Sequence, residues 1–79
     1  MTSDGTEGLA TLVVDARGMR CPWPALRLAR AMRGADDVLL LADDPQAGRE
    51  VAALASEHGW QIADETGEAD AARWRVRRV

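Results

Sequence analysis

The order of strand-like and helix-like segments is the feature that most restricts the fold of this chain. Two short apolar runs are each followed by a stretch in which apolar residues recur at i, i+3, i+4 and i+7, the spacing of an amphipathic helix, and two more strand patterns close the chain. In chain order the predicted elements are strand 11–15, helix 25–33, strand 38–42, helix 45–58, strand 60–63 and strand 73–77. The order β-α-β-α-β-β fits two layers most simply, so we expect an α+β sandwich in which both helices cover one face of a mixed four-stranded sheet.

The last predicted strand alternates strictly between arginine and apolar residues. Because successive side chains of a strand point to opposite faces, Trp74 and Val76 are expected to face the core and the arginines to face water. A sheet with one wet face carries helices on one side only. Alternate residues of strand 38–42 must then lie on the open face, either Leu39 and Leu41 or Val38 and Leu40. Apolar side chains left uncovered there would indicate a partner surface or a dimer.

The length of the chain, 79 residues, is enough for one domain and too short for a second. Residues 1–10 are almost free of apolar side chains, so we expect them to form a flexible tail and residues 11–79 to form the domain. A core of this size leaves no room for a large enclosed cavity, so chemistry should occur at the surface or in a shallow groove.

Composition restricts the partners and the compartment. The formal net charge of −3 argues against tight nucleic-acid binding. No apolar run approaches the roughly 18 residues of a membrane span, and the first residues show no basic stretch followed by an apolar segment. We therefore expect a cytoplasmic protein without a membrane partner.

The chain has one cysteine and one histidine. This count excludes an internal disulfide, a CxxC redox pair and a zinc site built by this chain alone, so we expect no metal. His58 falls at the far end of the second helix, whereas Cys21 precedes the first. We therefore expect His58 to be a partly buried helix-end residue and not a catalytic base.

Cys21 lies where the first helix should begin, and we expect it to be the N-cap residue. Pro22 and Pro24 then take the first and third helical positions, where a backbone N–H has no partner within the helix and its absence is tolerated. The remaining N–H groups and the positive end of the helix dipole favour the thiolate, and Arg17 and Arg20 act in the same direction. The sequence therefore predicts an exposed or half-exposed thiol with a lowered pKa.

Short motifs surround this position. Residues 15–24 read D-A-R-G-M-R-C-P-W-P, the second strand ends in Asp-Asp-Pro at 43–45, and the second helix ends in His-Gly-Trp at 58–60. Together they resemble the D-x-x-G-[LM]-x-C-P-x-P signature, the following Asp-Asp-Pro and the helix-to-strand step of the TusA/SirA-like family of small sulfur-carrier proteins. The resemblance extends over about residues 12–78 and implies a two-layer βαβαββ fold, in agreement with the order of elements.

The resemblance also implies a reaction. In this family the first cysteine of C-P-x-P accepts sulfane sulfur as a persulfide from a donor, such as a cysteine desulfurase or a rhodanese, and passes it to an acceptor protein. Applied to this chain, the resemblance implies that Cys21 is the persulfide carrier and that Gly18 supplies the tight turn before it. Pro22 and Pro24 form a rigid frame for the sulfur. Such exchange between sulfur atoms requires no metal and no cofactor.

Partner-binding residues are implied around the thiol. Asp43, Asp44 and Arg49 match the region in which members of the family shape a groove near the sulfur. Trp23 stands where the tRNA-thiolation branch often has glutamate, and an exposed indole is an apolar anchor of the kind found at interfaces. The residues predicted to bind partners are Arg20, Trp23, Arg27, Asp43, Asp44 and Arg49.

A second class of function stays open. The βαβαββ order is also found in small RNA-binding domains, and the arginines of the first helix and last strand would suit RNA or an acidic partner. A non-catalytic binding or regulatory module of this kind predicts salt-dependent RNA binding that survives Cys21→Ser. A thiol redox sensor is a third interpretation, although this chain lacks a resolving cysteine. For a sulfur carrier, the pathway stays open among tRNA thiolation, molybdenum-cofactor maturation, sulfur oxidation and selenium handling.

Overall fold

The structure, a computed structural model, describes residues 11–68 and 71–79. Its elements are β1 (Leu12–Asp15), α2 (Trp23–Met32), β2 (Asp37–Ala42), α3 (Ala47–His58), β3 (Gln61–Asp64) and β4 (Ala72–Arg77). The predicted order is confirmed, and every boundary lies within two residues of the predicted one. The predicted tail, residues 1–10, lies outside the described residues.

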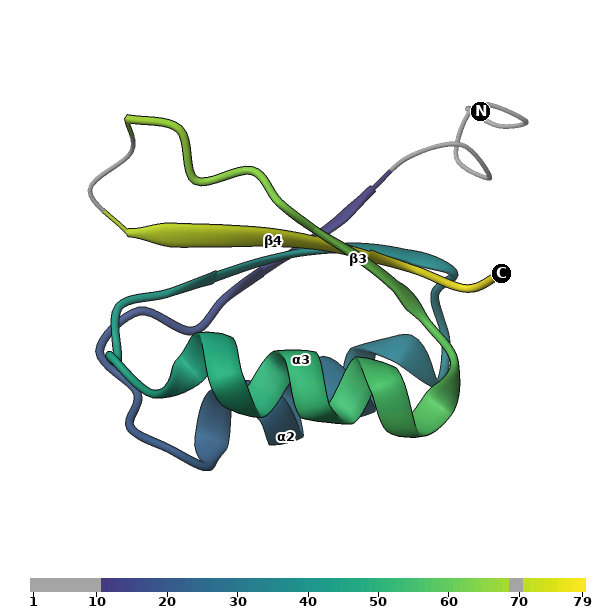
Figure 1. Cartoon of the computed structure of the whole chain (residues 1–79), viewed down its shortest axis with the longest axis horizontal. Helices are drawn as coiled ribbons and strands as arrows, with labels where there is room; N and C mark the ends of the chain where they lie inside the picture. The colour runs from purple at the N-terminus through teal and green to yellow at the C-terminus, as the bar shows by residue number, and fades with distance from the viewer. Residues whose placement is uncertain (1–10, 69–70) are drawn as a thin grey trace.

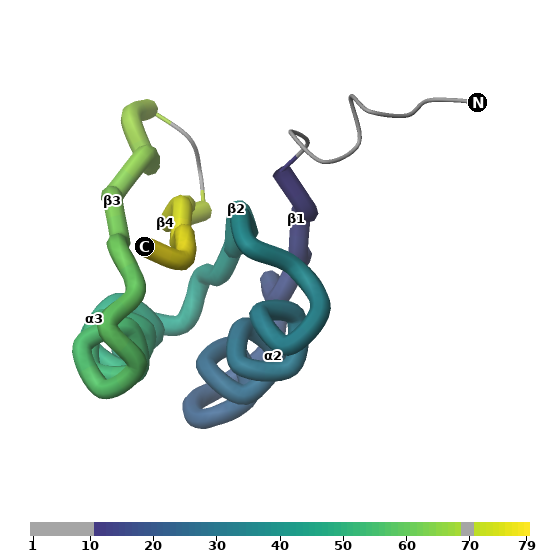
Figure 2. Tube along the Cα trace, turned by 90° about the vertical axis from the view of Figure 1, so that its right-hand side faces the viewer, coloured from purple at the N-terminus to yellow at the C-terminus, as the bar shows by residue number. Residues whose placement is uncertain are grey.

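The four strands form one mixed sheet in the order β1-β2-β4-β3. β1 and β2 are parallel, whereas β4 is antiparallel to both of its neighbours, β2 and β3. Both helices lie on the same face of this sheet, as Figure 1 shows. The view along the layers in Figure 2 places α2 beneath β1 and β2, and α3 beneath β3. The expected two-layer α+β sandwich is therefore confirmed.

The parallel pairing of β1 and β2 determines where the loops before the helices lie. Because the two strands run in the same direction, they end at the same edge of the sheet, and the chain turns into α2 and α3 from that edge. The loop at 16–22 and the segment at 43–46 therefore approach each other, at the left of Figure 1, although they are distant in sequence.

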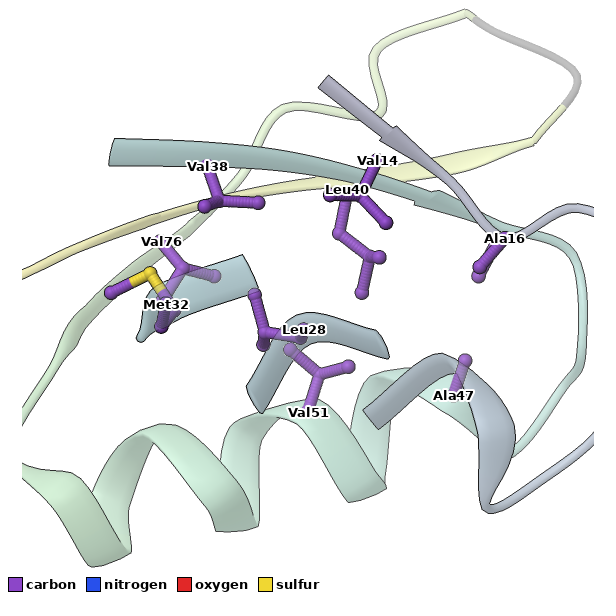
Figure 3. Close-up of a cluster of buried hydrophobic side chains, with 10 residues drawn as sticks. Val14, Ala16, Leu28, Met32, Val38, Leu40, Ala47, Val51 and Val76 are labelled. Carbon is purple, nitrogen blue, oxygen red and sulfur yellow. The ribbon is translucent and has the colours of Figure 1, made fainter. Parts of the chain in front are cut away.

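The core lies between the sheet and the two helices (Figure 3). Its largest fully buried side chains are Leu28, Met32, Leu40, Val38, Val51, Val76 and Pro24. They come from both helices and from the two central strands, β2 and β4, and each large apolar side chain buried in this way contributes about 1.5–3 kcal/mol. Since Val38 and Leu40 face the helices, Leu39 and Leu41 lie on the open face, where both are half-buried.

The open face of the sheet carries an ion pair. Asp37 accepts two hydrogen bonds from the guanidinium of Arg75, at 3.0 and 2.7 Å, and lies 3.5 Å from the guanidinium of Arg77. The hydrogen bonds from Arg75 lower the pKa of Asp37. Trp74 packs against the core and Val76 is buried, so the predicted alternation of β4 is confirmed. Two outward arginines are thus already paired with a carboxylate of the sheet.

Candidate functional site

Cys21 is a free, half-buried cysteine in the loop between β1 and α2. The prediction that it is the N-cap of α2 is wrong by one residue, because the N-cap is Pro22. The backbone N–H of Trp23 donates to the carbonyl of Arg20 at 2.8 Å, which closes a turn around the cysteine before the helix begins. The N–H of Leu26 then donates to the carbonyl of Pro22 at 3.1 Å. The thiol therefore lies just outside the first turn of α2.

The two prolines that flank Trp23 have different surroundings. Pro22 is exposed, whereas Pro24 is fully buried in the core at the second helical position. Burial of Pro24 anchors the start of α2 against the sheet. Exposure of Pro22 leaves the surface beside Cys21 open to solvent.

The loop before the thiol is shaped by local and long-range hydrogen bonds. Asp15 accepts bonds from the backbone N–H of Arg17 at 3.1 Å and from its guanidinium at 2.8 and 2.7 Å. These bonds lower the pKa of Asp15 to about 2. Gly18 follows with φ at +83°, a left-handed conformation that residues with a Cβ rarely adopt. The expected tight turn is therefore present at Gly18.

Two carboxylates at the end of β2 hold this loop from across the sheet edge. Asp43 accepts a 2.9 Å hydrogen bond from the N–H of Gly18, and Asp44 accepts a 2.7 Å bond from the N–H of Cys21. An Asp just before a Pro favours a helix N-cap, but Asp44 does not cap α3, whose N-cap is Gln46 and has no side-chain cap. The Asp44 carboxylate instead bonds a backbone group that the parallel strands bring within reach.

Glu50 is a site residue that the sequence analysis missed. It lies in the first turn of α3, is half-buried and is close enough to the Cys21 thiol to raise its pKa. An acidic residue in a first helical turn is common because it complements the helix dipole, so nothing in its local sequence distinguishes it. Its relation to the thiol follows only from the parallel strands, which start both helices at the same edge.

The pKa of the Cys21 thiol is raised from its ordinary value of 9.0, and the prediction of a lowered pKa is wrong. Burial of the sulfur is the largest cause. The charge of Glu50, its hydrogen bond to the thiol and the charge of Asp44 add to it. The positive end of α2 was expected to dominate, but burial of the sulfur and the carboxylates of Asp44 and Glu50 all act in the opposite direction. The surroundings of Cys21 therefore disfavour its thiolate.

The predicted partner-binding residues lie in three separate places. An open hollow of about 390 Å³ beside the thiol loop is lined by Gly18, Met19, Arg20, Asp43, Asp44 and Pro45. Trp23 and Arg27 lie on the exposed surface of α2, where Trp23 is 59% exposed and the Arg27 guanidinium lies 3.8 Å from the Met19 sulfur. Arg49 is exposed on α3 and does not line the hollow.

His58 is distant from the thiol in the fold. It is the last residue of α3, whereas Glu50, which contacts Cys21, lies in the first turn of that helix. The imidazole stacks on the Trp60 ring, with centroids 4.5 Å apart and planes 12° apart. His58 is exposed and not partly buried as predicted. This stack explains its position without a catalytic role.

Within residues 11–68 and 71–79, no group of three or more His, Cys, Asp or Glu side chains is arranged to hold a metal ion. In the same part of the chain, neither helix has the length and apolar character needed to cross a membrane.

Comparison with known proteins adds to this geometry. The chain matches the family model of sulfurtransferase TusA over residues 12–78. It is also similar to a SirA-like protein from Desulfitobacterium hafniense, known from a crystal structure, with a TM-score of 0.74 and 21% sequence identity. That similarity covers 85% of this chain and 96% of the other, and it shows that the two share a fold.

Proposed function

The chain belongs to the TusA sulfurtransferase family, and from this premise we propose that Cys21 carries sulfane sulfur as a persulfide between a donor protein and an acceptor protein. Family membership supports a role in sulfur transfer in general. The proposal adds the residue, the chemical form of the sulfur and the need for two partners. Residues 11–79 are proposed as the sulfur-carrier domain.

The loading step is an exchange between sulfur atoms. The Cys21 thiolate attacks the terminal sulfur of the donor's cysteine persulfide, so that a new S–S bond forms on Cys21 and the donor's S–S bond breaks. The donor cysteine leaves as a thiolate and takes up a proton equivalent to the one that Cys21 lost. Delivery repeats the step, with the acceptor's sulfur as the nucleophile and Cys21 as the leaving group. No net oxidation occurs in either step.

The observation that carries the proposal is the position of Cys21. Its thiol is partly exposed, and its backbone is held by Asp44 at the edge where both helices begin. The adjoining hollow is open to solvent, as transfer between two proteins requires, because each partner must bring its own cysteine to the sulfur. We propose that Gly18, Pro22 and Pro24 frame the thiol.

The partners and the setting belong to the same proposal. A donor of the cysteine desulfurase or rhodanese type would supply the sulfur, and a relay protein would accept it. We propose that the partner surfaces include Trp23 and Arg27 on α2, together with Arg20 and Asp43 in the hollow. Arg49 is retained as a candidate because it is exposed on α3. A cytoplasmic setting suits a single free thiol, since cytosolic thiols are kept reduced.

Intact-mass spectrometry tests the proposal. The purified chain is incubated with a cysteine desulfurase and L-cysteine, or with a rhodanese and thiosulfate. The expected result is a gain of about 32 Da that dithiothreitol removes, which separates a persulfide from irreversible sulfinic oxidation of nearly equal mass.

Cys21→Ser is the matched control, because it removes the sulfur and keeps the size of the side chain. It should gain no mass under the same conditions while its circular dichroism spectrum is unchanged. A wild-type chain that gains no reversible adduct from either protein donor, or a Cys21→Ser chain that gains one, would overturn the proposal.

A further inference from the structure

A groove between the two helices leads away from the thiol. It has a volume of about 230 Å³, and its apolar lining includes Pro22 and Leu26 on the α2 side and Leu54 on α3. Leu26 is 50% exposed although it is a large apolar residue. Trp23, three residues earlier, lies on the same side of α2 and extends the apolar surface toward the start of the helix.

The charged residues that line this groove are both acidic. Glu50 and Glu57 lie on α3, and no described residue that lines the groove is basic. They are seven residues apart, which is about two helical turns or roughly 10 Å. The groove is therefore an apolar surface with a negative charge near each end.

Glu50 connects the groove to the reacting sulfur. Its side chain lines the groove and also raises the pKa of the Cys21 thiol. Pro22, the next residue after the cysteine, lines the groove as well. A segment bound in the groove would therefore end beside the sulfur atom.

We propose that the groove between α2 and α3 docks a segment of the sulfur-donor protein in which an apolar side chain is flanked by two Arg or Lys side chains. The apolar side chain packs between Leu26 and Leu54, and the cations pair with Glu50 and Glu57. This inference rests on the proposed persulfide function. It adds the surface at which the donor binds and the chemistry of the segment that binds there.

The donor fits this surface better than the acceptor because of the step that it serves. During loading Cys21 is the nucleophile, and only its thiolate reacts. Burial of the sulfur and the charges of Glu50 and Asp44 all raise the pKa of the thiol, so a cation that pairs with Glu50 would remove one of these causes and favour the thiolate as the donor arrives. Delivery depends instead on the acceptor's own thiolate. Docking and activation of Cys21 would then be one event.

The test compares two sources of sulfur at low salt, with loading followed by intact mass. One source is a cysteine desulfurase charged with L-cysteine, and the other is inorganic polysulfide, which needs no docking surface. Glu57→Arg reverses the charge at the end of the groove far from the thiol, and Leu26→Ser removes apolar surface at an exposed position. Glu65→Arg makes the same change of charge at an exposed position outside the groove.

Glu57→Arg is expected to slow loading by the desulfurase about tenfold and to weaken its salt dependence, as reversal of a charge at a binding surface does. Leu26→Ser should slow it several-fold. Both variants should be loaded by polysulfide at the wild-type rate, and Glu65→Arg should match wild type with both sources.

Three results would overturn the inference. One is loading of Glu57→Arg by the desulfurase at the wild-type rate. Another is equal slowing with polysulfide, which would indicate damage to the thiol itself. The third is slowing of delivery to an acceptor with loading unchanged, which would assign the groove to the acceptor. Failure of the persulfide proposal itself is separate, since polysulfide would then leave no reversible adduct on wild type.

Discussion

The backbone N–H of Cys21 donates a 2.7 Å hydrogen bond to the carboxylate of Asp44, which lies 23 residues later in the chain. This bond joins the loop before α2 to the segment before α3. A second bond, from the N–H of Gly18 to Asp43, joins the same two segments. The thiol is therefore held by the end of β2, and its position depends on how the two parallel strands pair.

Asp44→Ala should destabilise the fold by about 1–2 kcal/mol, because it leaves the part-buried N–H of Cys21 without a charged acceptor. Urea unfolding followed by circular dichroism measures this change. Asp44→Asn keeps an oxygen acceptor at the same place and should recover more than half of the lost stability. An alanine variant within about 0.3 kcal/mol of wild type would show that the bond does not hold the loop.

The architecture could be predicted from the sequence because it depends on local periodicity. The alternation in β4 and the helical spacing of apolar residues are each visible within a few consecutive residues, and the structure confirms both. The position of Asp43 and Asp44 near the thiol came from the family resemblance. Their partners could not be read from local spacing, since both bonds cross between segments that only the folded sheet brings together.

The electrostatics of the site was the part that local reasoning predicted wrongly. A cysteine before a helix suggests a lowered pKa when that helix alone is considered. In the fold, burial of the sulfur raises the pKa most, and Glu50 on the other helix adds to the rise, although no pattern around Cys21 refers to it. A contact between distant segments also overrides local preference at Asp44. Its position before a proline favours a helix cap, but its carboxylate accepts a hydrogen bond from the N–H of Cys21 instead.

Glu50→Gln should lower the pKa of the Cys21 thiol, because the charge that disfavours the thiolate is removed while the size of the side chain is kept. Burial of the sulfur remains, so part of the elevation should persist. The rate of alkylation by iodoacetamide against pH reports the pKa, and its rise should move to lower pH in the variant. Glu65→Gln, at an exposed position away from the thiol, should leave the profile unchanged. An unshifted profile for Glu50→Gln would contradict the contact.

Arg17→Gln should raise the pKa of Asp15 from about 2 toward its ordinary value of 3.8, because the hydrogen bonds from Arg17 are the largest causes of the lowered value. A carboxyl group with a lowered folded-state pKa stabilises the fold above its unfolded pKa. That contribution is lost as the pH falls from about 4 to about 2. The side-chain carboxyl 13C shift of Asp15, followed by NMR against pH, measures this pKa. A midpoint that stays near 2 in Arg17→Gln would assign the shift to another group.

Gly48→Ala should fail to give the stabilisation of about 1 kcal/mol that helix propensity alone predicts. Gly48 lies inside α3, and a Cβ at this position would come within 3.1 Å of Cζ2 of the Trp74 ring, which packs over it from β4. The propensity gain and the displacement of the ring should nearly cancel, which leaves the stability within about 0.5 kcal/mol of wild type.

A double-mutant cycle separates the two effects. Trp74→Val removes the ring and puts in its place a β-branched residue that suits a strand, and in that background Gly48→Ala should stabilise the chain by close to the full propensity value, with a coupling of about 0.5–1 kcal/mol. Urea unfolding of the four proteins gives the coupling. If Gly48→Ala stabilised the wild-type background as much as the Trp74→Val background, contact with the ring would not explain the glycine, because the cost of the Cβ would then be independent of the indole.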